Sequence, residues 1–190
     1  MTAHRRGTSP KLSAEAQDDA VQRVVHSDEL SPRDRAAATL VIVFAQQVED
    51  VVRLTWDDVT VTDETVSIRL GASDITLPPP LDESLRQLLA MPGHDQTAAH
   101  PNSNWVFRGH SPGQHIAAGH LRIRLQSVFS TRAARLGTLH ELTRQAPVAI
   151  LAETLGYSPA TIERHAAGSA ATYAQYVATI EHLRDGGLPA

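Results

Sequence analysis

Six arginines lie between residues 101 and 145, a stretch that contains a single acidic residue, Glu141. These arginines are Arg108, Arg122, Arg124, Arg132, Arg135 and Arg144. A guanidinium group keeps its charge, and its planar donors match phosphate oxygens and the edge of guanine. The flanking stretches are acidic, with nine basic and sixteen acidic side chains in residues 1–100 and two basic and four acidic in residues 146–190. The clustered charge therefore predicts a surface for double-stranded DNA that includes Arg122, Arg124, Arg132 and Arg135.

Residues 147–165 follow the pattern of a helix-turn-helix. Helices over 147–155 and 160–167 would be separated by Gly156, which tolerates the positive φ of such a turn. Ser158 would cap the second helix, and Ile162 would pack back on the first. The residues left to face DNA are Thr161, Arg164 and His165. An ordinary helical hairpin explains the same pattern equally well, so both interpretations stay open.

Hydrophobic periodicity and turn residues predict the elements that must position these side chains. They indicate an α+β fold that is predominantly α-helical and carries a small antiparallel β-sheet. The sheet comes from β-branched runs that Gly71 interrupts and that Pro78–Pro80 ends, because proline cannot donate to a β-ladder. The expected strands are 59–61, 66–70 and 75–77, and the expected helices are 13–25, 33–47, 48–54, 81–91, 118–128, 133–145, 147–155, 160–167 and about 170–183.

The length of 190 residues fits one domain with short additions at its ends. We expect an N-terminal arm with a short helix over residues 1–29, the main domain over 30–185 and a tail over 186–190. The chain has no cysteine, which excludes disulfides and cysteine-ligated metals. It has neither an apolar run that could span a membrane nor a secretory signal, so we expect a cytoplasmic protein without a membrane partner.

Other combinations of reactive side chains give weaker signals. His110, His115 and His120 recur every five residues, but glycine and proline lie between them and no carboxylate accompanies them. We therefore predict no metal site and no small-molecule cofactor. Ser130 could pair with His140 or His120, yet the sequence around it lacks the elbow and oxyanion motifs of hydrolases.

Several short motifs occur in an order that suggests a known family. They are Leu54-x-Trp56-x-Asp58-Val59, the hairpin-like Val66–Gly71 followed by Ile75–Pro78, the apolar Trp105–Phe107, and Leu155-Gly156. In this respect the segment from about Leu30 to Val177 resembles the catalytic domain of the tyrosine recombinases, or phage-type integrases. The resemblance implies a mostly helical domain with a small sheet, bound to DNA, in which a tyrosine attacks a phosphodiester.

The catalytic positions that this resemblance implies hold other residues. Gln47 stands where the family has its first arginine, and the hairpin turn Gly71–Asp74 contains no lysine. Tyr157 replaces the histidine of the Leu-Gly-His motif. His165 and Ala166 occupy the place of the nucleophile. We therefore interpret the chain as a degenerate relative that is predicted to be inactive in DNA strand transfer.

A few candidates could still take over parts of the chemistry. The family's His-x-x-Arg motif aligns with Thr131 and Ala134, or with Arg132 and Arg135 if the alignment slips by one residue. The nearest tyrosine that follows is Tyr173, with Tyr176 beyond it. Their spacing of three residues is also typical of aromatic side chains that face a core. The candidates that remain for catalysis are Arg132, Arg135 and Tyr173.

Three hypotheses for function follow from the sequence. The first is an integrase-like DNA-binding protein without efficient strand cleavage. The second is a small transcriptional regulator whose helix-turn-helix covers 147–155 and 160–167. The third is a protein–protein interaction module on an integrase scaffold, which the acidic N-terminal half favours. In each case the chain could also pair with a protein partner or with a second copy of itself.

Overall fold

The structure is a computed structural model that describes residues 11–27, 29–91, 103–111 and 113–170. Its elements follow the chain in the order α1 (Ala14–His26), α2 (Pro32–Ile42), α3 (Val48–Val51), the 3-10 turn η1 (Trp56–Asp58), β1 (Val59–Val61), β2 (Val66–Arg69), β3 (Asp74–Leu77), α4 (Glu83–Ala90), α5 (Ala118–Leu125), α6 (Thr131–Gln145) and α7 (Val148–Leu155). A further helix covers residues 159–170. The predicted α+β class is confirmed, with helices in the majority and one small sheet.

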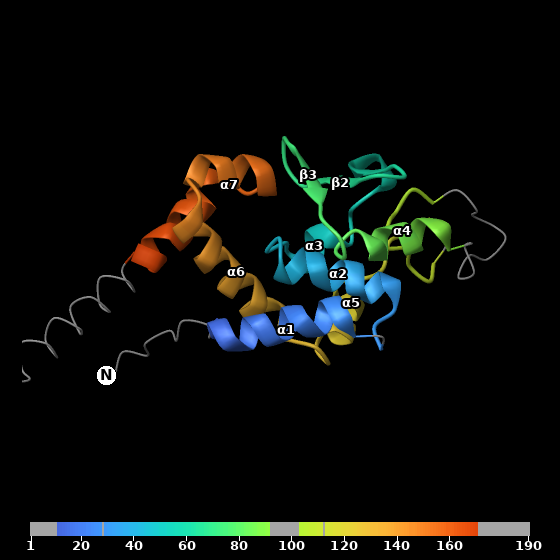
Figure 1. The fold of residues 1–190 in the computed structure, drawn as a ribbon, viewed down its shortest axis with the longest axis horizontal. Coiled ribbons are helices and arrows are strands. Elements are labelled where there is room, and N and C mark those ends of the chain that lie inside the picture. Colours follow the sequence, from blue (N-terminus) through green and yellow to red (C-terminus); the bar gives the residue numbers. More distant parts are fainter. Residues whose placement is uncertain (1–10, 28, 92–102, 112, 171–190) are drawn as a thin grey trace, which may run out of the picture.

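The sheet is antiparallel in the order β1–β2–β3. Val66 pairs with both Val61 and Leu77, and Ile68 pairs with Val59 on one side and Ile75 on the other. Val66 and Ile68 are buried while their neighbours along β2 are more exposed, as the period of two along a strand requires. Figure 1 shows the sheet standing beside the helical body, with α4 following it.

Helix α2 lies at the centre of the helical body and packs against α1, α4, α5 and α6. Its residues from Ala36 to Ile42 are all buried. A helix that is apolar around its whole circumference needs neighbours on all sides, which explains this central place. Ser31 caps its first turn by accepting a hydrogen bond from the backbone N–H of Asp34, and Pro32 occupies the first helical position.

Helix α2 ends at Ile42, five residues before the end that the sequence predicts. The chain reverses at Ala45, whose φ of 56° lies in the left-handed region. This conformation costs an alanine about 1–2 kcal/mol, so the surrounding structure must impose it. The apolar residues from Val43 to Ala45 continue the helical pattern. Because no glycine marks the left-handed position, sequence analysis does not detect the break.

Other helix ends differ from expectation by a few residues, and the helix expected over 170–183 lies almost entirely outside the described residues.

The turn after α7 has the geometry that the sequence predicts. Gly156 ends the helix with a φ of 75°, and the hydroxyl of Ser158 accepts a hydrogen bond from the backbone N–H of Thr161. Ile162 is fully buried against Leu151 and belongs to a second core cluster beneath α7. The helix after the turn continues through residue 170, beyond the expected end at 167.

The turn between β2 and β3 approaches the end of α7 closely enough to require glycine on both sides. A Cβ atom on Gly71 would lie 2.0 Å from the carbonyl oxygen of Glu153, and one on Gly156 would lie 2.2 Å from that of Leu70. The backbone N–H of Ala72 donates to the Glu153 carbonyl at 2.8 Å. The sheet is therefore docked on α7 through backbone atoms.

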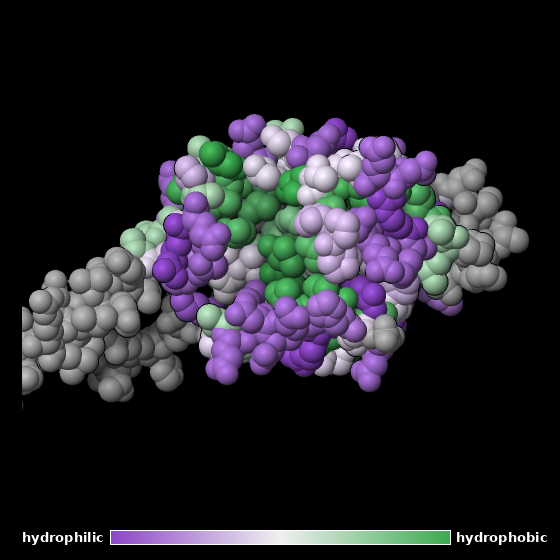
Figure 2. Space-filling model, in the orientation of Figure 1, coloured by the Kyte–Doolittle hydropathy of each residue, from purple (hydrophilic) through white to green (hydrophobic). Residues whose placement is uncertain are grey.

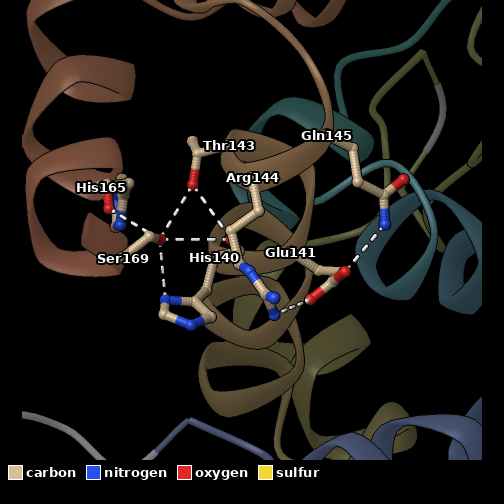
Figure 3. Close-up of polar contacts among 7 residues, drawn as sticks. All are labelled: His140, Glu141, Thr143, Arg144, Gln145, His165 and Ser169. Carbon is tan, nitrogen blue, oxygen red and sulfur yellow. Dashed lines mark hydrogen bonds and ion pairs between the residues drawn. The ribbon is translucent and has the colours of Figure 1, made fainter. Parts of the chain in front are cut away.

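A buried polar network holds the 159–170 helix against α6 (Figure 3). The hydroxyl of Ser169 lies 2.8 Å from Nδ1 of His140 and 3.0 Å from the hydroxyl of Thr143. Ser169 is only 4% exposed, so these bonds are made away from water. Burial lowers the pKa of His140, and the charges of Lys11 and Arg144 lower it further against the effect of Glu141. A neutral imidazole therefore fixes the helix that carries His165.

The close approach at Gly156 predicts a large difference between two glycine substitutions. Gly156→Ala should destabilise the protein by at least about 2 kcal/mol, because alanine is strained at this φ and its Cβ would overlap a carbonyl oxygen. Gly119→Ala is the matched control in α5, where nothing lies within 4 Å of the added Cβ. It should be neutral or stabilise by up to about 1 kcal/mol. Urea denaturation of both variants measures the difference, and equal effects would refute the docking of the sheet on α7.

Candidate functional site

Some of the positions that the resemblance assigns to catalysis lie near the ends of α3, α6 and α7. Gln47 immediately precedes α3, Tyr157 follows α7, and Arg135 lies on α6. The guanidinium of Arg135 donates to the Tyr157 hydroxyl at 3.3 Å, and its charge also acts on His165 in the 159–170 helix. We call Glu49, Arg122, Arg135, Tyr157 and His165 the Arg135 cluster.

Tyr157, which the resemblance places at the position of the family's histidine, makes a structural hydrogen bond through its hydroxyl. It donates to the carbonyl oxygen of Ala45 and accepts from Arg135. Burial raises the pKa of the Tyr157 phenol, and the hydrogen bond from Arg135 opposes this effect only in part. The phenol therefore stays protonated and donates to the carbonyl oxygen of Ala45, the strained residue of the chain reversal.

Gln46 reinforces the same junction from the other side. It is 6% exposed, and its side-chain amide donates to the carbonyl oxygens of Leu155 at 3.1 Å and Phe44 at 3.2 Å. The Leu155 carbonyl belongs to the last turn of α7, where backbone acceptors have no partner within the helix. The chain reversal after α2 and the end of α7 thus satisfy each other's polar groups.

Gln47, which the resemblance places at the position of the family's first arginine, lies next to solvent and to an acid. It is exposed, and its amide nitrogen lies 3.4 Å from a carboxylate oxygen of Asp50. An amide can donate a hydrogen bond but carries no charge. Asp50 adds a negative charge beside it, so this corner of the site repels a phosphate where the family would attract one.

The carboxylate of Glu49 interacts with both arginines of the Arg135 cluster, with one by an ion pair and with the other through its charge. Arg122 forms an ion pair with Glu49, and Arg135 lies close enough to act on the same carboxyl group. The pKa of Glu49 is held low, first by a hydrogen bond from its own backbone N–H and then, against the effect of burial, by Arg122 and Arg135. Sequence analysis missed this acid, because nothing in the spacing links Glu49 to arginines so far along the chain.

His165, which the resemblance places at the position of the nucleophile, is a half-buried imidazole. Burial lowers its pKa, and the positive charges of Arg135 and Arg164 lower it further. Tyr157 is the one tyrosine in the part of the chain that the structure describes, and its hydroxyl is engaged. Tyr173 and Tyr176 lie outside the described residues. The described part of the cluster therefore offers no tyrosine for attack on a phosphodiester.

The remaining residues predicted to face DNA divide into two groups. Arg132 and Arg164 are exposed near the Arg135 cluster, and Arg132 lies one turn before Arg135 on α6. Thr161 is partly buried, with its hydroxyl 2.9 Å from that of Ser158 in the helix cap. Arg124 instead projects toward the start of α2.

Arg124 forms a paired ionic contact with Asp34 in α2. Its Nε atom donates to a carboxylate oxygen at 2.8 Å. Burial opposes ionisation of Asp34, but the hydrogen bonds from Arg124 and Ser31 outweigh it and leave the pKa of the carboxyl below its usual value. The guanidinium of Arg124 is thus occupied on a different side of α5 from Arg122, because residues two apart on a helix do not share a face.

Two further properties concern the described residues as a whole. No group of three or more histidine or acidic side chains among them is arranged to hold a metal ion. None of their helices combines the length and the apolar character needed to cross a bilayer.

Comparison with known proteins bears on the fold. No protein-family model matches the chain, and no curated protein matches it. The chain is similar to the crystal structure of XerA recombinase, with 14% identity and a TM-score of 0.59 over 93% of this chain and 66% of that chain. Two complexes of XerH site-specific recombinase with difH substrates, also 14% identical, give TM-scores of 0.61 (pre-cleavage) and 0.62 (post-cleavage).

The XerH alignments cover 83% and 90% of this chain but only 50% and 53% of the recombinase chains. The chain thus spans between half and two thirds of the length of these structures. At this level of identity the similarity concerns the fold. The architecture expected from the sequence is confirmed: the chain has a fold like that of the tyrosine recombinase catalytic domain.

Proposed function

We propose that this chain binds double-stranded DNA through the surface around the Arg135 cluster and does not cleave it efficiently. The observation that carries the proposal is the convergence of Arg135, Tyr157 and His165 at one junction. These residues are distant in sequence, and the resemblance alone assigned them to a common site. Their meeting supports that assignment, while their chemistry argues against strand transfer.

Exposed cations support DNA binding. Arg132 and Arg164 are exposed beside the cluster, and Arg122 remains 40% exposed despite its ion pair with Glu49. A duplex carries one negative charge per 1.7 Å of its axis, so a few arginines on one surface are enough for non-specific binding at low salt. The similar XerH structures were determined with difH substrates bound. We leave Arg124 out of the proposed surface because Asp34 holds its guanidinium.

The missing charges argue against cleavage. Attack of a tyrosine on a phosphodiester builds negative charge on a pentavalent phosphorane, which preorganised cations must stabilise. Here Gln47 is neutral, the Gly71–Asp74 turn has no lysine, and Glu49 offsets part of the charge of Arg122 and Arg135. The loss of a single electrostatic donor typically lowers the rate by about 10²–10³. Several losses together make strand transfer ineffective.

Two other functions have support of their own. The turn geometry at Gly156 favours a regulator whose α7 and 159–170 helix form a helix-turn-helix, with Arg164 exposed on the second helix.

Figure 2 favours a protein interaction module, because apolar side chains reach the surface at the centre of the face shown, within a hydrophilic rim. That module could bind another protein or a second copy of the chain. DNA binding separates it from the other two hypotheses.

The proposed domain organisation follows the same account. We assign residues 30–185 to the integrase-like scaffold, residues 1–29 to an arm with a short helix, and 186–190 to a tail. Helix α1 of the arm packs against α2 and α6, with Ala20 and Val24 in the core. We further place the protein in the cytoplasm and propose that it acts without a cofactor.

The ion pair at Glu49 predicts that removing an acid strengthens DNA binding. Glu49→Gln frees Arg122 for phosphate and removes the negative charge near Arg135, so affinity for any duplex should rise and the salt slope should steepen by about one unit. Glu15→Gln, on the exposed start of α1, is the control with the same change in charge.

The exposed arginines give a second prediction. The double variant Arg132→Ala with Arg164→Ala should flatten the salt slope of DNA binding by about one unit per lost contact. Fluorescence anisotropy over a salt series measures these slopes, and no binding by the parent protein at low salt would leave the interaction module as the better hypothesis.

Cleavage is tested separately with a nicked suicide substrate, which traps a covalent protein–DNA adduct on a denaturing gel. We expect no adduct while duplex binding is intact, because the phosphorane lacks its cations. An adduct that disappears in Tyr173→Phe but persists in Tyr176→Phe would overturn the inactive assignment. It would identify Tyr173 as the nucleophile, with Arg132 and Arg135 as the candidate cations to test next.

A further inference from the structure

Polar contacts attach the second half of the 159–170 helix to the rest of the domain. Ile162, in the first turn of this helix, is fully buried and belongs with Leu139 of α6 to the second core cluster. From residue 163 to residue 170, Ser169 is the only buried side chain. Burial of apolar surface is the main force that fixes a helix on its neighbours. The 163–170 part of the helix therefore depends on the contacts of Ser169.

Ser169 has one hydroxyl proton and several neighbours within hydrogen-bond range. Its Oγ atom lies 2.8 Å from Nδ1 of His140 and 3.0 Å from the hydroxyl of Thr143 (Figure 3). The carbonyl oxygens of His165 and His140 are further away, at 3.1 Å and 3.2 Å. A neutral imidazole can accept the serine proton at an unprotonated Nδ1, whereas an imidazolium can only donate. Protonation of His140 therefore leaves the serine proton to the more distant acceptors.

A proton on His140 would also add a positive charge beside two others. Burial lowers the pKa of His140 most strongly, and the charges of Lys11, ahead of α1, and Arg144, on α6, lower it further. Glu141 acts in the opposite direction and offsets only part of this effect. From the 159–170 helix, the contacts with this imidazole come from the uncharged hydroxyl of Ser169. The docked helix therefore favours the neutral ring.

A second imidazole lies between the same two helices. Burial lowers the pKa of His165, and Arg135 on α6 and Arg164 on its own helix lower it further. Release of the helix exposes both rings to water and brings their pKa values back toward the ordinary 6.5. Below about pH 6.5 the released state therefore binds more protons than the docked state, and acid favours release. Above this range the two histidines make docking independent of pH.

We propose that His140 and His165 form an acid-sensitive latch, which holds the 159–170 helix on α6 while both imidazoles are neutral. The helix carries Arg164, so its release removes this cation from the surface around the Arg135 cluster. The latch is a property of the fold and operates whether or not the chain binds DNA.

Hydrogen exchange of the full chain, followed by mass spectrometry at about pH 7.5 and about pH 5.5, tests the latch. Each exchange rate is divided by the rate of an unstructured peptide at the same pH, which gives the protection of a segment. Residues 163–170 should be less protected than α2 at both pH values, because they open without the rest of the domain. Their protection should fall severalfold on acidification, by at most about tenfold per pH unit for each proton taken up.

Variants assign this pH dependence to the two histidines. His140→Gln removes one titrating group while its amide can still meet the Ser169 hydroxyl, so the change in protection should become smaller. His140→Gln combined with His165→Gln should leave protection nearly independent of pH. His120→Gln, exposed on α5, is the matched control and should keep the full change. Ser169→Ala keeps both imidazoles but should lower the protection of residues 163–170 severalfold already at about pH 7.5.

Protection that does not depend on pH, or a dependence that the double variant retains, would overturn the latch. Equal protection of residues 163–170 and α2 would also overturn it, because the helix would then open only when the whole domain unfolds. If the double variant loses the protection of α2, the single variants decide. An unchanged pH effect in His140→Gln, with unchanged protection in Ser169→Ala, would then reject the latch. None of these measurements uses DNA, so their outcome is independent of the proposed function.

Discussion

The hydrogen bond from the Tyr157 hydroxyl to the Ala45 carbonyl joins the chain reversal after α2 to the turn that follows α7. Alanine does not adopt a φ of 56° without support, and this bond and those of Gln46 supply it. Close by, Gly71 and Gly156 let the sheet dock on the end of α7 through backbone atoms. The central helix, the sheet and the 147–170 segment thus meet at one junction, and the positions of Arg135 and His165 depend on it.

Under the proposed function, the same junction accounts for a recombinase-like fold that lacks efficient strand cleavage. An active site needs charges that remain available to the substrate, whereas this junction uses its polar groups internally. Tyr157 bonds to the backbone, Arg135 bonds to Tyr157, and Arg122 pairs with Glu49. Cations that remain exposed, such as Arg132 and Arg164, surround the junction and suit contact with a phosphate backbone. Binding and cleavage thus make separable demands on one scaffold.

Local features of the fold could be predicted from the sequence because their causes are local. The period of two in Val66–Arg69 and the prolines after Leu77 indicate the sheet, and Gly156 indicates the turn after α7. The end of α2 could not be predicted, since Ala45 gives no sign of a positive φ. The partners of the arginines could not be predicted either, because Glu49 meets Arg122, and Asp34 meets Arg124, only after folding.

The most direct test of this account is the effect of Tyr157→Phe on the free energy of unfolding and on DNA affinity, measured on the same preparation. Removing the hydroxyl leaves the Ala45 carbonyl without its donor and Arg135 without an acceptor. We expect a destabilisation of about 1–3 kcal/mol, with the DNA affinity of the folded protein changed by less than about twofold. Unchanged stability with a loss of DNA affinity would contradict the account, because it would assign the Tyr157 hydroxyl to the ligand instead of the fold.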